Sequence, residues 1–228
     1  MSDLRLVVFD VDGTLVDSEA DIFASMQRAH DNVGLPHPTR AAVRAIVGLS
    51  LEQAFALLVP DEHAHHRAAM VDGYKAAYHA LRVEKGPASS PLFPGARAVL
   101  ETLRADPWTL LAVATGKSKR GLDALIENHE LQGWFISEQV ADFHPSKPHP
   151  SMLHTALSDA GVAPGRAVMI GDTSFDMDMA RAARVGAIGV SWGYHPVARL
   201  DADIIIDDFA ALPGAIDRVL EQEQENHS

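Results

Sequence analysis

The chain has 228 residues, 47% of them hydrophobic, with a net charge of −12 and no cysteine, so it can pack a core but excludes disulfides, thiolate metal sites and a cysteine nucleophile. A surface this acidic repels phosphate backbones and anionic lipids, so we expect neither nucleic acid nor a membrane as a partner. The apolar runs are far shorter than the roughly 18 residues that span a bilayer and no secretion signal is visible, so we expect a cytoplasmic protein, either monomer or homodimer.

The chain begins with one strand-like run and continues with a long helical stretch. Residues 4–9 are apolar, rich in β-branched side chains and followed by an Asp-Gly turn, which is typical of a buried strand. Residues 16–90 hold no such run and are punctuated by glycine and proline. Helical periodicity in this stretch is found at 21–33, 39–47, 51–59 and 61–81. We therefore predict an all-helical module at 16–90, inserted into a core formed by 1–15 and 91–228.

Strand-like and helical segments alternate through the rest of the chain. The strand-like runs are 110–114, 167–170, 187–190 and 204–206. The helical segments are 96–103, 118–129, 150–160, 174–185 and 209–222. This alternation predicts a Rossmann-like α/β core of three layers, a parallel sheet with helices on both faces.

Acidic and hydroxyl side chains follow two of the predicted strands. Asp10 and Asp12 lie in the sequence Asp-Val-Asp-Gly-Thr directly after the first strand, and Thr115 and Gly116 follow the strand at 110–114. A hydroxyl group and free backbone N–H groups at such a position can hold an anion. Each motif alone also has a purely structural explanation as a turn.

Two further motifs carry charge in the second half of the chain. Asp172 follows the strand at 167–170, and Asp176 stands four residues later, so both can point toward one spot. Lys147 immediately precedes a predicted helix. Acids at a helix start also offset the helix dipole, and a lone lysine is usually solvated, so these motifs are weak when taken separately.

Taken together, the four motifs predict one site. Ligands of open α/β sheets bind at the carboxyl ends of the strands, where all these side chains are expected. Oxygen ligands without cysteine favour Mg²⁺ over zinc. A cation beside Thr115 and Lys147, which can hold an anion, suggests a phosphoryl substrate.

In this order the motifs resemble those of the haloacid dehalogenase superfamily of phosphohydrolases. The helical insertion resembles the C1-type cap of that superfamily, and the resemblance covers nearly the whole chain, with phosphoglycolate phosphatase-like members the most similar. The motifs that carry it are Asp10-Val11-Asp12-Gly13-Thr14, Thr115, Lys147, and Gly171-Asp172 with Asp176, and Leu92-Phe93-Pro94-Gly95 resembles the usual return from cap to core.

The resemblance implies a catalytic chemistry. Asp10 would attack phosphorus and form an aspartyl-phosphate, which water then hydrolyses. Asp12 would protonate the leaving oxygen and later deprotonate the water. Lys147 would neutralise charge, while Thr115 and the N–H of Gly116 would hold the phosphoryl group. An acid at Asp12 sets the chain apart from the dehalogenases and phosphonatases of the superfamily, whereas Gly116 departs from the Asn that many relatives carry.

The resemblance also implies metal ligands and cap contacts. Mg²⁺ would be held by Asp10, the backbone carbonyl of Asp12 and Asp172, with Asp176 supporting it. In relatives, a cap loop dips into the core site. The residues predicted to contact substrate from that region are Gly48, Ser50 and Arg44, although Ser50 is equally explained as a helix N-cap.

These inferences predict a Mg²⁺-dependent phosphatase that hydrolyses a small phosphorylated metabolite, and phosphoglycolate is the first substrate that we expect. Pyrophosphate, a sugar phosphate or a nucleotide monophosphate is also compatible. The alternatives are a β-phosphoglucomutase-like mutase, a pyrophosphatase, and a non-enzymatic receiver module that accepts a phosphoryl group. The length of the chain and its helical insertion argue against the receiver module.

Overall fold

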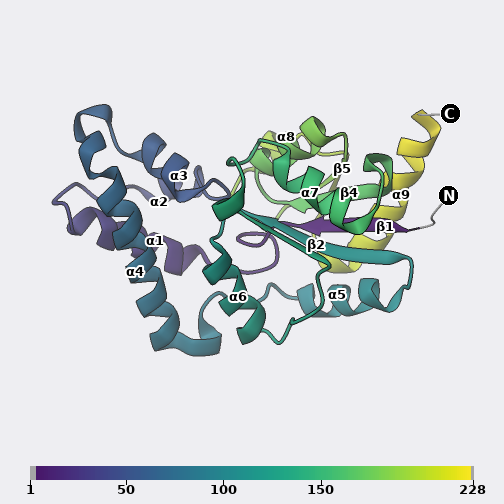
Figure 1. The fold of residues 1–228 in the computed structure, drawn as a ribbon, viewed down its shortest axis with the longest axis horizontal. Helices are drawn as coiled ribbons and strands as arrows, with labels where there is room; N and C mark the ends of the chain where they lie inside the picture. Colours follow the sequence, from purple (N-terminus) through teal and green to yellow (C-terminus); the bar gives the residue numbers. More distant parts are fainter. Residues whose placement is uncertain (1–3, 227–228) are drawn as a thin grey trace.

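A six-stranded sheet forms the centre of the computed structural model, which describes residues 4–226 (Figure 1). The strand order is β3-β2-β1-β4-β5-β6, and every neighbouring pair is parallel. Phe9, the last residue of β1, pairs with Val113 on one side and Ile170 on the other, so the ends of three strands meet at one edge. The strands are β1 (Arg5–Phe9), β2 (Thr109–Thr115), β3 (Ser137–Val140), β4 (Ala167–Gly171), β5 (Gly186–Val190) and β6 (Ile204–Ile206).

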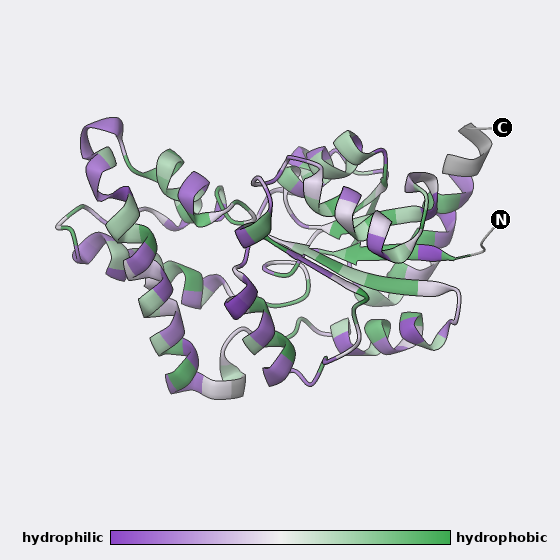
Figure 2. Ribbon diagram, viewed as in Figure 1, coloured by the Kyte–Doolittle hydropathy of each residue, from purple (hydrophilic) through white to green (hydrophobic). Residues whose placement is uncertain are grey.

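Helices cover both faces of the sheet and bury the two sets of alternating strand side chains. Val7 and Phe9 point into the cluster formed with α5, α6 and α9, whereas Leu6 and Val8 point into the cluster formed with α7 and α8. The strands at the centre of the sheet are accordingly mostly hydrophobic in Figure 2, as expected for a parallel sheet buried on both faces. The helices are α5 (Ala96–Ala105), α6 (Lys119–Asn128), α7 (Ser151–Ala160), α8 (Ser174–Ala183) and α9 (Leu212–Asn226). The predicted three-layer α/β fold is confirmed.

Four helices between β1 and α5 lie beside the sheet rather than on its faces (Figure 1). They bury a cluster of their own, in which Met26, Phe55 and Met70 are fully enclosed. Thr39 and Ser50 cap two of them by accepting the backbone N–H of Ala42 and of Gln53. The helices are α1 (Glu19–Asp31), α2 (Arg40–Arg44), α3 (Leu51–Leu58) and α4 (Arg67–Lys85).

The helical insertion is thus part of the confirmed fold class, while the division at residues 16–90 stays a prediction. The predicted core range also includes 1–3 and 227–228, which lie outside the described residues. Among the helices of residues 4–226, none combines the length and the apolar character needed to cross a membrane.

The structure adds one strand that the sequence analysis missed. β3 has the sequence Ser-Glu-Gln-Val, with a single apolar side chain, and it forms one edge of the sheet. An edge strand has only one hydrogen-bonded neighbour and tolerates polar residues, so no apolar run marked it. Several helix limits also differ from expectation; for example, residues 61–66 form a 3₁₀ helix before α4, and α9 continues to Asn226.

Candidate active site

The carboxyl ends of β1, β2 and β4 bring the predicted site residues together. β1 lies between β2 and β4: from β1 the chain continues to β2 and β3 on one side, and it then crosses to β4 on the other side. Loops that leave neighbouring strand ends in opposite directions open a crevice, which is where ligands bind in such sheets. Asp10 stands at this point, with its backbone N–H bonded to the carbonyl of Ile170 at 2.9 Å.

Lys147 joins two of the predicted carboxylates in a buried ion pair. Its Nζ lies 2.6 Å from Oδ1 of Asp10 and 2.6 Å from Oδ1 of Asp176, and its side chain is 0% exposed. The capping box of α8 positions Asp176, whose Oδ2 accepts the backbone N–H of Thr173 at 3.0 Å while the Thr173 hydroxyl lies 2.7 Å away. Lys147 therefore holds a fixed positive charge against Asp10.

Hydrogen bonds to both of its carboxylate oxygens hold Asp172 in place. The hydroxyl of Thr14 donates to Oδ1 at 3.0 Å, and the backbone N–H of Tyr194 donates to Oδ2 at 2.8 Å. Gly13 has a positive φ of 89°, and a Cβ there would lie 2.2 Å from Oδ2 of Asp172. Only glycine permits this close approach of the first loop to Asp172.

Burial and like charge raise the pKa values of two carboxyl groups in this cluster. Burial raises the pKa of Asp10 to about 7, with Lys147 opposing the shift and the charge of Asp176 adding to it. Burial also raises the pKa of Asp172, and the charges of Asp10 and Asp176 act in the same direction. Burial disfavours the charge of Lys147, but Asp10 and Asp176 outweigh it and raise the pKa of that amine. The cluster thus holds more negative than positive charge when it is fully ionised.

These features fit a bound metal ion. One oxygen each of Asp10, Asp172 and Asp176 lies within 4.8 Å of the others, and all three residues are buried. The Oδ2 atom of Asp10 is buried and has no hydrogen-bond partner among the described residues. Three carboxylates against one lysine leave a negative charge that a divalent cation would neutralise, and an all-oxygen donor set suits a hard cation. The cluster can therefore hold a metal ion.

Asp12 lies beside this cluster but makes different contacts. Its Oδ1 accepts the hydroxyl of Ser18 at 2.5 Å and lies 2.7 Å from Nζ of Lys117. Lys117 also donates to the hydroxyl of Tyr78, on helix α4 of the insertion, at 3.2 Å. The side chain of Asp12 is therefore outside the carboxylate cluster, and Lys117 links it to the insertion.

A cavity of about 330 Å³ lies between the carboxyl ends of the strands and the helical insertion. Asp10, Asp12 and Thr115 line it from the core, and Gly48 lines it from the insertion. At Gly116 a Cβ atom would lie 2.6 Å from the carbonyl oxygen of Gly48, so glycine allows the insertion to touch the core. We refer to this cavity as the cleft.

Two predicted substrate contacts from the insertion do not line the cleft. Arg44 forms a bidentate ion pair with Glu19, at 2.9 and 2.7 Å. Ser50 caps α3, and its backbone N–H donates to the hydroxyl of Ser146 at 2.9 Å. The helix-capping explanation of Ser50 therefore accounts for its side chain, and Ser50 ties the insertion to the loop that carries Lys147.

Sequence reasoning assigned no role to three residues that complete the site. Lys117 stands two residues after Thr115, so the strand-end argument applied to Thr115 could have included it. Ser18 and Tyr194 had no signal of that kind. The hydroxyl of Tyr194 accepts the backbone N–H of Ser18 at 3.0 Å, a contact between residues 176 positions apart.

Comparison with known proteins supports the same chemistry. The sequence model of the haloacid dehalogenase-like hydrolases matches residues 7–190. A probable phosphatase, IndB, from Dickeya dadantii is 38% identical over 224 residues, covering 94% of each chain. A phosphoglycolate phosphatase from Pseudomonas putida is 32% identical over 220 residues, covering 93% of this chain and 80% of that protein.

A solved structure agrees in fold over nearly the same length. The haloacid dehalogenase-like family hydrolase from Streptococcus pneumoniae superposes with a TM-score of 0.80 at 28% identity, covering 94% of this chain and 99% of that one. Family match, relatives and fold coincide on the segment that carries the carboxylate cluster. The chain therefore belongs to the haloacid dehalogenase-like hydrolases and is a phosphatase.

Proposed function

We propose that the protein is a Mg²⁺-dependent phosphomonoesterase that hydrolyses a small phosphorylated metabolite through an aspartyl-phosphate on Asp10. The observation that carries this proposal is the buried contact of Lys147 with Asp10 and Asp176, next to Asp172 and at the base of the cleft. The relatives named phosphoglycolate phosphatase support phosphoglycolate as the first substrate to test.

In the first half of the reaction, a carboxylate oxygen of Asp10 attacks phosphorus and the bond from phosphorus to the ester oxygen breaks. Lys147 orients Asp10 through Oδ1 and offsets the negative charge of the phosphoryl group. Thr115 and the N–H of Gly116 hold the phosphoryl oxygens. A Mg²⁺ ion held by Asp10, the Asp12 carbonyl, Asp172 and Asp176 would supply Lewis-acid stabilisation of the developing charge.

Asp12 transfers a proton in each half of the reaction. Its carboxyl group donates a proton to the departing ester oxygen, and Lys117 stabilises the carboxylate that remains. A water molecule then attacks phosphorus of the aspartyl-phosphate, and Asp12 takes up its proton. Inorganic phosphate leaves, and Asp10 and Asp12 return to their starting states.

The proposal is tested by the metal dependence of turnover on an aryl phosphate. We expect full activity with Mg²⁺ and loss of at least about 100-fold after removal of metal with EDTA, because anionic attack on an anionic ester lacks its main charge compensation. Readdition of Mg²⁺ in excess over EDTA serves as the control and should restore the rate. Undiminished turnover in excess EDTA would contradict the proposal.

The contact between Gly116 and the insertion gives a second prediction. We expect Gly116→Ala to lower kcat/KM about 10- to 100-fold, because its Cβ would push the Gly48 carbonyl away and misplace the insertion over the site. Gly165→Ala is the control, since a Cβ there meets nothing within 4 Å. Steady-state kinetics with thermal melts would check this, and wild-type kcat/KM in Gly116→Ala would show that the contact does not position the insertion.

The mutase alternative uses the same aspartyl-phosphate and returns the phosphoryl group to a sugar. Assaying sugar phosphates for free phosphate and for isomerised product separates the two reactions. Isomer without free phosphate would replace the hydrolase proposal with the mutase. Turnover beyond one phosphoryl group per protein excludes a receiver module. The cytoplasmic location and the oligomeric state stay predictions.

A further inference from the structure

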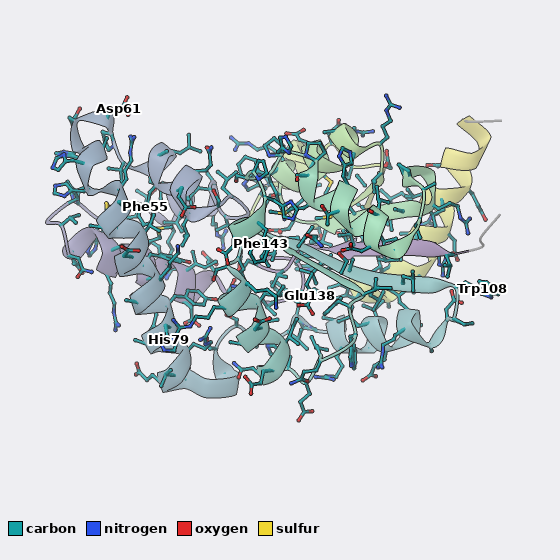
Figure 3. All side chains as sticks on the ribbon, viewed as in Figure 1. Phe55, Asp61, His79, Trp108, Glu138 and Phe143 are labelled. Atoms are coloured by element: carbon teal, nitrogen blue, oxygen red, sulfur yellow. The ribbon has the colours of Figure 1, made fainter. Side chains whose placement is uncertain are left out.

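A cluster of two arginines and one histidine lines the part of the cleft formed by α4 and α6. Nη2 of Arg82 lies 3.0 Å from Nδ1 of His79, and Nη2 of Arg120 lies 3.0 Å from Nε2 of the same ring. Arg82 and His79 belong to the insertion, while Arg120 belongs to the core. Figure 3 labels His79 on the lower part of α4, and all three residues line the cleft that also contains Asp10.

The hydrogen bonds within this cluster are incomplete. Both guanidinium groups are donors only, and a neutral imidazole has one acceptor nitrogen. The charge of Arg120, partial burial and the charge of Arg82 all lower the pKa of His79 and favour the neutral ring. One guanidinium therefore faces a ring N–H instead of an acceptor. An oxyanion would accept hydrogen bonds from both arginines and complete the arrangement.

The charge of the cluster is also uncompensated. Neither Arg82 nor Arg120 forms an ion pair with any carboxylate that the structure describes. Among the described residues that line the cleft, the acidic ones besides Asp10 and Asp12 reduce to Asp142, which accepts the backbone N–H of Lys119 at 2.7 Å. In a protein with a net charge of −12, such a positive patch inside the substrate cleft favours an anionic ligand there.

Two tyrosines of α4 line the cleft between this cluster and the catalytic end. Tyr78 contacts Lys117, which contacts Asp12, and Arg82 stands one helical turn beyond Tyr78 on α4. Tyr74 stacks on Tyr78 with ring centroids 5.9 Å apart. The cleft thus offers the phosphoryl site, then aromatic surface, and then two guanidinium groups.

We propose that Arg82 and Arg120, which flank the ring of His79, bind a second anionic group of the substrate. The substrate is then a phosphomonoester that carries a carboxylate or a second phosphate beyond an uncharged spacer longer than the carbon skeleton of phosphoglycolate. This inference rests on the proposed phosphatase function and narrows its substrate class.

The test compares alkyl phosphates with ω-carboxyalkyl phosphates of the same length, from phosphoglycolate up to six carbons, in the presence of Mg²⁺. A third series of α,ω-alkane bisphosphates distinguishes a phosphate from a carboxylate as the second anion. For the longer chains, we expect either the carboxyalkyl phosphates or the bisphosphates to have a kcat/KM at least about tenfold higher than the alkyl phosphates of the same length. A higher kcat/KM for phosphoglycolate than for the longer carboxyalkyl phosphates would contradict the proposed length of the spacer.

Variants identify the residues responsible. In the double variant Arg82→Gln and Arg120→Gln, we expect the ratio of anionic to neutral kcat/KM to fall about tenfold or more. Arg28→Gln is the matched control, because Arg28 is an exposed arginine of the insertion outside the cleft lining, and it should leave the ratio unchanged. An unchanged ratio in the double variant would overturn the second anion site.

Binding separates this inference from the proposed function. On Asp10→Asn protein, isothermal titration with a six-carbon carboxyalkyl phosphate and with the neutral analogue measures the same preference without turnover. We expect tighter binding of the carboxylated ligand, and loss of that preference when both arginines are replaced. Equal binding of the two ligands would refute the anion site. A preserved preference without hydrolysis of any ester would refute the phosphatase proposal alone.

Discussion

Asp10→Asn is expected to lose turnover by at least about 10⁴-fold while the protein stays folded. Asparagine has nearly the same shape as aspartate, but its amide cannot form the acyl phosphate. Lys147 keeps its 2.6 Å contact with Asp176 in the variant, so the buried amine retains a partner. Removing a buried carboxylate whose pKa is already raised to about 7 also relieves repulsion with Asp176.

The measurement is kcat on an aryl phosphate together with a thermal melt of each protein. Asp178→Asn provides the control, because Asp178 is an exposed acid on the same helix as Asp176. It should keep the wild-type rate. A wild-type rate in Asp10→Asn would refute the nucleophile assignment. Loss of the folded state in the thermal melt would contradict the expectation that Asp10 acts in catalysis without being required for folding.

Lys147→Met is expected to damage both stability and catalysis. Its amine is fully buried between Asp10 and Asp176, and removing one partner of a buried ionic group costs about 3–5 kcal/mol. Methionine keeps much of the apolar stem, so the loss reports the charge rather than a cavity. We also expect kcat to fall about 10²- to 10³-fold or more, since a fixed positive charge at the phosphoryl group is lost.

Urea unfolding in EDTA gives the stability change, and kcat in Mg²⁺ gives the catalytic one. Lys119→Met is the matched control, because Lys119 is 40% exposed and its surface ion pairs with Asp123 and Glu138 are worth about 1 kcal/mol or less. An equal and small effect of the two substitutions would mean that burial of the Lys147 amine does not matter.

The order of strands and helices in the core was predictable because its signals are local. Each buried strand except β3 is an apolar run, and helices such as α3 and α8 begin at Ser50 and Thr173, which cap them. β3 was missed because an edge strand of mixed polarity is recognised only from its hydrogen bonds to β2.

The carboxylate cluster of the site was predictable for a related reason. Residues that follow parallel strands must gather at one edge of the sheet, so the sequence alone predicts that Asp10 and Asp172 are neighbours. The i, i+4 spacing then placed Asp176 with them, and the structure brings the three within 4.8 Å. Lys147 was a weak motif in isolation, yet its amine lies between Asp10 and Asp176.

The sequence by itself thus determined the fold class, the helical insertion and the acids at the strand ends, because periodicity and strand order act over short stretches of chain. Only the tertiary structure decided the contacts across the cleft. These contacts are those of Lys117 with Asp12 and Tyr78, of Gly116 with the Gly48 loop, and of Arg120 with His79. They join residues at least 39 positions apart and depend on how the insertion sits on the core. That placement results from packing between surfaces, and no local pattern of residues encodes it.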